Sequence, residues 1–398
     1  MIVTFDKEAL CTAVTPAMSA VANKNTITAI EGISLTARED GSVILNSFDL
    51  EKGIEYVFAA EVTEPGSYII NGQKFNQIIR SMPDRIRIEI NEQMKTSITS
   101  GKSEFTMNAI PGNEFPNTPE LVGDIGFTIP ACELRDAITK TLYAVASNEP
   151  RPALNGIFFR ITPDHLTLVS SDSFRLAVCE KEIRFGDVMA VRGLDAAIIV
   201  PGKTIAELYK MLPDDTEPVR ILATAKHIIF KMGPLSFFSR LIDAEYVNYE
   251  KFIPKDPVIH VSVPTKALLS SLERASLVTE DRALGQAKSS VRFTLEDQCL
   301  YVSAVSVNGT VNDEIPVEKT GPDLRIGFNC RFLLDALRAC DSEYIKLALV
   351  SPLVSMVITA DEDRMSEEDK KERDERREKV GILSERDLHL AVPCHMRD

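Results

Sequence analysis

The sequence predicts an α+β protein built from three similar modules that follow one another along the chain. A short strand followed by a capped helix occurs three times, at residues 1–14, 125–138 and 258–272. In each copy apolar residues first alternate, as in a half-buried strand, and then change to helical spacing. Asp6, Pro130 and Pro264 mark these changes, because Asp caps helices and Pro favours the first helical position.

A second strand–helix unit follows each first one after about 70 residues, at residues 68–83, 198–213 and 325–338. A repeat of this length is too long for a solenoid, whose units run roughly 20–50 residues. A chain of 398 residues also has room for about two to four domains. We therefore expect three domains, each with a sheet and two helices, at residues 1–123, 124–255 and 256–398.

Further strands are expected in a similar order in each module. In the first, alternating segments flank the turn at 38–41 and predict a hairpin. The other strands of this module are expected at 55–62, 87–90, 96–100 and 103–109. Those of the second are expected at 156–161, 165–170, 171–178, 220–224, 227–232 and 236–242. Those of the third are expected at 291–295, 299–305, 309–315, 345–350, 354–359 and 387–392.

Residues 361–379 form a highly charged segment inside the third module, with 17 charged residues in 19. Acidic residues precede basic ones by four positions, as in Glu367/Lys371 and Glu372/Arg376, which supports a helix. Without an apolar stripe the segment is either a solvated helix or a flexible loop. We expect a tolerated surface insertion, spanning 361–383, more than a functional element.

Composition argues against several classes of protein. No run approaches the ~20 apolar residues that span a bilayer, and the N-terminus does not resemble a signal peptide. The seven cysteines are scattered without a CxxC pair, which is typical of reduced thiols in the cytoplasm. Neither a Cys/His cluster nor a GxSxG, Walker or GxGxxG motif is present. We therefore expect no metal, no cofactor and no catalytic residues, although an enzyme is not excluded.

The net charge of −14 is distributed unevenly. The six expected helices together contain 14 Lys/Arg and 11 Asp/Glu, which leaves −17 for the rest of the chain. Mixed charge on solvated helix faces is one interpretation. The other is that the helices share a face that is turned toward a polyanion.

Five motifs together resemble the bacterial DNA polymerase III beta subunit, the DNA sliding clamp, over nearly the whole chain. They are Leu154-Asn-Gly-Ile-Phe-Phe, Ser171-Asp-Ser-Phe-Arg-Leu-Ala, Val200-Pro-Gly-Lys, the segment 241–254, and Ile326-Gly-Phe-Asn. The resemblance implies a DNA-clamp fold and a ring formed by a head-to-tail homodimer, with helices lining the hole. It also implies a non-enzymatic, cytoplasmic processivity factor that encircles duplex DNA without sequence specificity. Its partners would be the polymerase III catalytic subunit, the clamp loader, and other replication and repair proteins.

The same resemblance implies a pocket for short peptide motifs of these partners. Carried over by position, the pocket comprises Leu154, Ser171, Ser173, Phe174, Arg175, Leu176, Val247, Lys251, Phe252, Phe332, Leu353, Ser355, Val392, Pro393, Cys394, Met396 and Arg397. The family usually has Gly-His or Gly-Tyr in place of Ser173-Phe174, Pro in place of Val247 and Met-Pro in place of Cys394-His395. The peptide preference therefore stays open.

DNA contacts and subunit contacts are expected elsewhere. The DNA-facing candidates are Lys24, Gln73, Lys74, Arg80, Arg135, Lys140, Asn148, Arg151, Lys203, Lys210, Arg274, Arg282, Arg331 and Arg338. Phe105, Leu277 and Val278 resemble positions of the subunit interface. Two alternatives remain: a clamp paralogue with altered partners, and a small-ligand protein or enzyme on the same fold.

Overall fold

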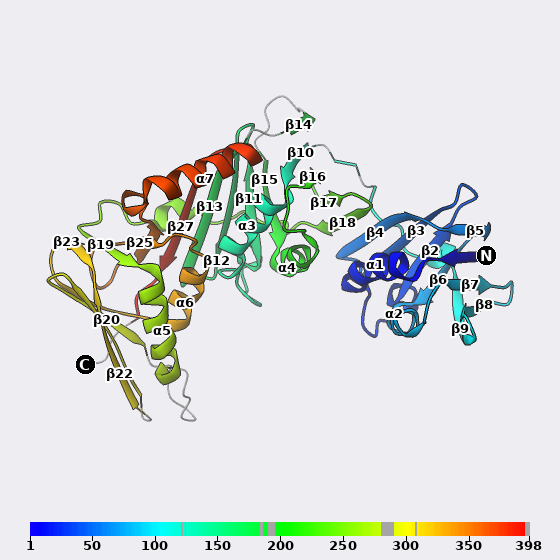
Figure 1. Ribbon diagram of the computed structural model, residues 1–398, viewed down its shortest axis with the longest axis horizontal. Coiled ribbons are helices and arrows are strands. Elements are labelled where there is room, and N and C mark those ends of the chain that lie inside the picture. Colours follow the sequence, from blue (N-terminus) through cyan, green and yellow to red (C-terminus); the bar gives the residue numbers. More distant parts are fainter. Residues whose placement is uncertain are drawn as a thin grey trace. The chain divides into compact units, whose positions relative to one another are not determined.

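The computed structural model describes residues 1–120, 122–123, 125–183, 186–189, 196–279, 290–306 and 309–394. These residues divide into two compact units, each of which is described by itself. The first is built mainly from Met1–Ala131 and Ala206–Leu241, and the second mainly from Cys132–Phe185 and Ile242–Asp398. Figure 1 colours both along the chain.

The first unit contains a 14-stranded sheet whose neighbouring strands run antiparallel. In spatial order its strands are β14 (Gly186–Met189), β10 (Ile125–Pro130), β16 (Pro218–Ala223), β17 (His227–Met232), β18 (Leu235–Arg240), β4 (Lys52–Ala59), β3 (Ser42–Phe48), β2 (Gly32–Ala37), β6 (Gly66–Asn71), β9 (Ser103–Pro111), β8 (Lys95–Ser100), β7 (Ile86–Ile90), β1 (Ile2–Phe5) and β5 (Glu61–Glu64). The sheet passes from the second module into the first where β18 pairs with β4, with Phe237 opposite Ile54.

Two helices of the first unit begin at side-chain caps. The Asp6 carboxylate accepts a hydrogen bond from the Ala9 amide (2.9 Å) before α1 (Lys7–Ala17). Asn71 accepts one from the Lys74 amide (3.1 Å) before α2 (Gly72–Ser81). Such caps satisfy amides that have no partner within the helix. Each helix buries one apolar face, with Leu10 on α1 fully buried.

The second unit contains a nine-stranded and a four-stranded antiparallel sheet. The larger has the spatial order β15 (Ala196–Pro201), β11 (Gly156–Ile161), β12 (His165–Ser171), β13 (Arg175–Ile183), β27 (Ile382–Ala391), β26 (Met356–Ala360), β25 (Tyr344–Leu349), β19 (Ile259–Pro264) and β23 (Glu318–Thr320). The smaller has the order β22 (Gly309–Pro316), β21 (Cys299–Ser306), β20 (Val291–Glu296) and β24 (Leu324–Phe328). Pairing of β13 with β27 joins the second module to the third.

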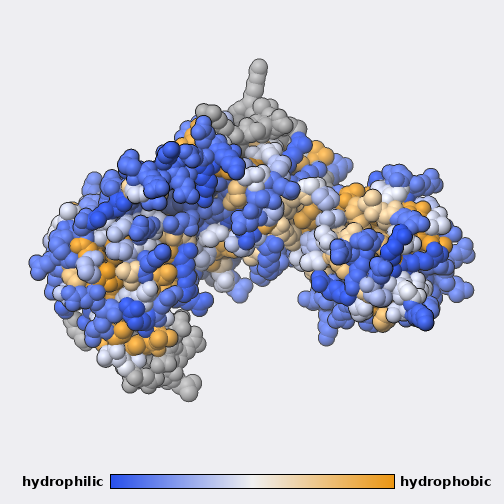
Figure 2. Space-filling view, viewed as in Figure 1, coloured by the Kyte–Doolittle hydropathy of each residue, from blue (hydrophilic) through white to orange (hydrophobic). Residues whose placement is uncertain are grey.

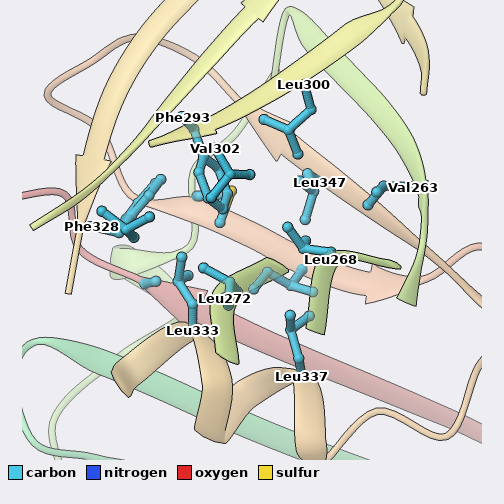
Figure 3. Packing of buried hydrophobic residues seen from close by; sticks show 14 of the residues in the cluster. Val263, Leu268, Leu272, Phe293, Leu300, Val302, Phe328, Leu333, Leu337 and Leu347 are labelled. Carbon is cyan, nitrogen blue, oxygen red and sulfur yellow. The ribbon is translucent and has the colours of Figure 1, made fainter. Parts of the chain in front are cut away.

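Helices α5 (Thr265–Thr279) and α6 (Cys330–Arg338) cover the core of the third module. Figure 3 shows Leu268 and Leu272 from α5 and Leu333 from α6 pointing toward strand residues such as Phe293 and Leu347. Burial of each such side chain contributes roughly 1.5–3 kcal/mol. The remaining module helices are α3 (Ala131–Leu142) and α4 (Gly202–Met211). The 3-10 helices are η1 (Met18–Ala20), η2 (Thr28–Glu31), η3 (Gly112–Glu114), η4 (Pro152–Asn155), η5 (Tyr249–Phe252) and η6 (Glu362–Arg364).

The charged insertion contains a helix, α7 (Glu367–Val380). The Ser366 hydroxyl caps its start by accepting from the Asp369 amide (3.0 Å), and Gly381 ends it with φ of 76°. Because that backbone conformation is left-handed, glycine is favoured there. Figure 1 shows α7 lying beside β27, and Figure 2 shows a hydrophilic surface over it. No residue of α7 is buried.

The predicted α+β fold, with two helices in each module, is confirmed. Of the two structures expected for the charged insertion, a helix or a loop, the structure has the helix, α7. The domain boundaries stay predictions, since the sheets continue from module to module. The strand predictions at 55–62, 171–178 and 387–392 were wrong: the first is interrupted at Ala60 between β4 and β5, the second contains the turn between β12 and β13, and β27 begins at Ile382 instead of residue 387. The first residues of β27 are mostly polar and pair with β13, with Ser384 opposite Glu182. Because they do not alternate between apolar and polar, the sequence shows no sign of a strand there. No helix in the described parts of the chain is long and apolar enough to cross a membrane.

Candidate functional site

A cavity of about 210 Å³ lies in the second unit and brings together distant parts of the sequence. Its lining residues are Arg151, Leu154, Ser171, Ser173, Arg175, Leu176, Val247, Phe252, Ser355, Leu390 and Val392. All of these except Arg151 and Leu390 belong to the pocket that the resemblance implies.

The floor of this cavity is apolar because β13 and β27 pair beside it. Leu176 and Leu390 face each other across the two strands and are buried. Leu154, on η4, is also buried, and Val392 packs against the same cluster. The floor can therefore receive an apolar side chain.

The turn between β12 and β13 forms a polar part of the rim. Ser173 adopts a left-handed backbone conformation with φ of 77°, a conformation that favours glycine. The Asp172 carboxylate holds this turn by accepting from the amides of Phe174 (3.0 Å) and Arg175 (3.1 Å). The Ser171 hydroxyl donates to the Arg175 carbonyl (2.7 Å). These hydrogen bonds fix the backbone conformation of the turn and therefore the directions of its side chains.

Arg175 ties this turn to α6. Its guanidinium donates to the carboxylates of Asp172 (2.9 Å) and Asp335 (2.6 Å). Its central carbon also lies 4.6 Å from the centre of the Phe332 ring. Two carboxylates and a cation–π contact fix the side chain at the edge of the cavity.

Arg151 lies at the rim, although the sequence predicted it as a DNA contact. Its guanidinium donates to the hydroxyl of Ser173 (2.6 Å) and to the carboxylate of Glu149 (2.8 Å). Leu390 was missed altogether, because in sequence it is one of many apolar strand residues. Alternation along the expected strand 387–392 could have placed Leu390 and Val392 on one face, but only the pairing of β27 with β13 brings that face to the cavity.

The segment before η5 is held on the sheet by Tyr246. Its ring stacks on Phe158 with 4.9 Å between ring centres, and its hydroxyl donates to the Val169 carbonyl (3.3 Å). Burial raises the pKa of the Tyr246 phenol well above its usual value, so the hydroxyl stays protonated. This anchor positions the neighbouring Val247 and, through η5, Phe252.

The other predicted pocket residues that the structure describes do not line the cavity. Phe174 is 60% exposed and stacks on Phe332 at 6.3 Å, while Leu353 is 82% exposed. Lys251 is exposed, and Pro393 and Cys394 are half-buried. The Cys394 amide donates to the Gly327 carbonyl (2.7 Å). Met396 and Arg397 lie outside the described residues.

Most DNA-facing candidates are exposed, and many lie on helices. The exposed ones are Lys24, Gln73, Lys74, Arg80, Asn148, Arg151, Lys203, Lys210, Arg274, Arg331 and Arg338. Arg274 and Arg338 form exposed ion pairs with Asp313 (2.8 Å) and Glu273 (3.1 Å). Such pairs contribute little to stability, so the guanidinium groups can exchange them for phosphates.

Three of the candidates differ from this pattern. Lys140 is buried, and its ammonium lies 2.5 Å from a Glu385 oxygen and 2.7 Å from an Asp387 oxygen. A buried and fully paired ammonium cannot reach a DNA phosphate, so we exclude Lys140 from the proposed interface. Arg135 is half-buried on α3, and Arg282 lies outside the described residues.

The predicted interface residues lie near open strand edges. Phe105 is 42% exposed on β9, where residues 103–108 pair only with β8 among the described strands. β22 is one of the two edge strands of the four-stranded sheet. Leu277 is 74% exposed on α5, and Val278 is half-buried against the core. Unpaired strand edges are templates for pairing with another chain.

Comparison with known proteins shows the family to which the chain belongs. Models of the N-terminal, central and C-terminal domains of the DNA polymerase III beta subunit match residues 1–119, 128–248 and 250–370. The beta sliding clamp of Halalkalibacterium halodurans is 32% identical over 358 residues, which cover 85% of this chain and 90% of that protein. The chain belongs to the DNA polymerase III beta subunit family. Its function is that of a DNA sliding clamp, a processivity factor in DNA replication.

Other sliding clamps are also similar to this chain in sequence and in fold. The beta sliding clamp of Bacillus subtilis is 28% identical over 369 residues, covering 90% of this chain and 96% of that protein. The crystal structure of the DNA polymerase sliding clamp from Bacillus subtilis covers the whole of both chains with a TM-score of 0.87 and 27% identity. A putative DNA polymerase III beta subunit from Eubacterium rectale gives a TM-score of 0.86 with 26% identity over the same extent. A small-ligand protein or enzyme on this fold is therefore not favoured.

Proposed function

We propose that the cavity beside β13 and β27 is where this sliding clamp binds short peptide motifs of its partners. The observation that carries the proposal is an apolar floor surrounded by fixed polar groups, with Leu176 below and Arg175 at the edge. An apolar peptide side chain buried on this floor would contribute roughly 1.5–3 kcal/mol. The partners are the polymerase III catalytic subunit, the clamp loader, and other replication and repair proteins.

The second part of the proposal concerns DNA. Exposed Lys and Arg on the helices, such as Lys74 and Arg331, would contact phosphates of duplex DNA. Contacts of this kind depend on salt and ignore base sequence. We expect a non-catalytic protein that works in the cytoplasm, where duplex DNA is replicated.

The third part concerns the oligomer. The open edge of β22 in one copy would pair with the free part of β9 in a second copy, with Phe105 and Leu277 contributing apolar contact. Two such heterologous contacts close a head-to-tail dimeric ring. Sedimentation of the purified chain tests this, because a monomer at micromolar concentration would contradict it.

The peptide site is tested by binding of a labelled polymerase-derived peptide to the full-length protein. Val247→Asp places a charge on the cavity wall and should weaken binding about tenfold or more. Leu383→Asp is the matched control, since Leu383 is 47% exposed on β27 and does not line the cavity. Removing residues 394–398 should abolish peptide binding and leave the dimer intact. Full-strength binding by both the truncated protein and Val247→Asp would refute the site.

A further inference from the structure

The charged groups around the cavity beside β13 and β27 do not balance. Two charged side chains line it, and both are arginines, Arg151 and Arg175. Arg151 pairs with one carboxylate, that of Glu149 (2.8 Å). Arg175 pairs with two, those of Asp172 (2.9 Å) and Asp335 (2.6 Å). In the described part of the chain, two guanidinium groups therefore face three carboxylates, which leaves a surplus of one negative charge at this edge.

The surplus charge comes from Asp335, which does not line the cavity itself. Asp172 also accepts hydrogen bonds from the backbone amides of Phe174 and Arg175, so several donors share its negative charge. Asp335 reaches Arg175 from a different element, α6. Its carboxylate turns a neutral ion pair into a group with a net negative charge.

Helix α6 holds Asp335 in a fixed position at this edge. Leu334 and Leu337 of the helix are buried in the core of the third module. Phe332 lies three positions before Asp335, and thus on the same side of the helix. The ring of Phe332 contacts the Arg175 guanidinium at 4.6 Å and stacks on Phe174 at 6.3 Å. Both contacts hold α6 against the turn between β12 and β13.

The pair of Arg175 and Asp335 is also partly withdrawn from water. The Arg175 side chain is 13% exposed and the Asp335 side chain is 25% exposed. Charges near a protein surface interact at an effective dielectric constant of about 20, so they act several times more strongly than in bulk water. A peptide bound in the cavity would therefore experience the surplus charge.

Arg175 keeps the capacity to bind a peptide. Its hydrogen bonds within the described residues use Nε and Nη1, and a guanidinium group has five N–H donors. The Nη2 group can therefore donate to an acceptor on the peptide. A carbonyl oxygen accepts without adding charge, whereas a carboxylate brings another negative charge to a group that already has a net negative charge.

We propose that Asp335 makes this cavity select against an acidic residue at the peptide position that lies beside Arg175. The inference rests on the proposed function of the cavity as a peptide site. Arg175 then donates to a neutral oxygen of the peptide, and the surplus carboxylate of Asp335 repels a Glu or Asp side chain there. Such repulsion of the wrong partner is a general source of binding specificity.

Fluorescence anisotropy with a labelled polymerase-derived peptide tests this proposal on the full-length protein. Each position of the peptide is replaced in turn by Gln and by Glu, which have similar shapes and differ in charge. At the position beside Arg175, the Glu peptide should bind the wild type about fivefold or more weakly than the Gln peptide. In Asp335→Asn this difference should fall to about twofold or less.

The variants separate the charge of Asp335 from its structural role. Asp335→Asn keeps the size of the side chain and an oxygen that accepts from Arg175. If the variant merely loosened α6, it would weaken the Gln and Glu peptides equally and leave their ratio unchanged. Asp335→Glu keeps the charge and should retain most of the difference. Glu273→Gln is the matched control, because it removes one negative charge from an exposed ion pair with Arg338 of α6, away from the cavity lining.

The outcomes distinguish this inference from the peptide site itself. If the wild type does not bind the parent peptide, the peptide site is refuted and the selection by Asp335 with it. If the parent peptide binds but the Glu/Gln ratio at every position is the same in the wild type and in Asp335→Asn, only the inference about Asp335 is wrong. Equal loss of the difference in Asp335→Glu, or in Glu273→Gln, would also overturn it.

Discussion

At the scale of single residues, His389 shows how burial changes the chemistry of a side chain. The residue is 1% exposed, and Tyr143 is its hydrogen-bond partner on one side. Burial, helped by the nearby Lys140 charge, lowers the pKa of the imidazole to about 3. The ring is therefore neutral in the folded protein at pH values where the unfolded chain protonates it, near 6.5.

This difference predicts the direction of a pH effect on stability. Between pH 3 and 6.5 the unfolded chain binds a proton at His389 that the folded protein does not bind. The free energy of unfolding therefore rises with pH across this range, and the contribution of His389 is fully present above it. Lowering the pH from 7 to 5 should cost about 2 kcal/mol through this residue. Urea unfolding of the wild type and of His389→Gln at both pH values measures this change in the free energy of unfolding. An equal loss in the two proteins would contradict the assignment.

Ser173 is the second residue with an individual effect, because its φ of 77° is unfavourable for a side chain with a Cβ atom. A β-branched residue is worse still in this conformation, whereas glycine adopts it freely. Ser173→Val should therefore be less stable than Ser173→Gly by about 1–2 kcal/mol. Chemical denaturation compares the two directly. Equal stability would mean that the turn relaxes to another conformation.

At the scale of elements, helices with caps were predictable and strands that depend on partners were not. Asp6 placed α1 correctly because a cap is a local signal. The start of β27 was misplaced because its polar residues are held by β13, far away in sequence. β14 and β23 were not predicted, since short edge strands lack alternation. Leu390 was missed in the candidate pocket because only the pairing of β27 with β13 brings it to the cavity.

Deletion of the charged insertion tests whether α7 contributes to stability. Removing residues 363–378 and closing the gap with a short Gly/Ser turn should lower the melting temperature by no more than a few degrees. The reason is that α7 buries no residue and is held mainly by ion pairs, such as Arg377 with Glu385 at 3.6 Å. Leu272→Ala in the core of α5 is the comparison, because it should cost about 2–5 kcal/mol. If the deletion lowered the melting temperature more than Leu272→Ala does, α7 would be part of the folded core.

At the scale of the whole molecule, the three modules are joined by shared sheets. β18 pairs with β4 in the first unit, and β13 pairs with β27 in the second. Repetition along the sequence predicted the number of modules, because each repeat contains the same strand–helix signals. Most of the candidate pocket came from resemblance rather than from periodicity, since Leu154, Leu176 and Val392 look like ordinary core residues in the sequence.

Retention on circular DNA is the measurement that tests the central claim most directly. The protein is loaded on a nicked circle by a clamp loader, and the circle is then cut once with a restriction enzyme. A ring that encircles DNA through exposed, sequence-independent phosphate contacts should slide off the new ends, so the protein should leave the DNA fraction on gel filtration. Equal retention on linear and circular DNA, or protection of one sequence in a footprint, would contradict a sliding clamp.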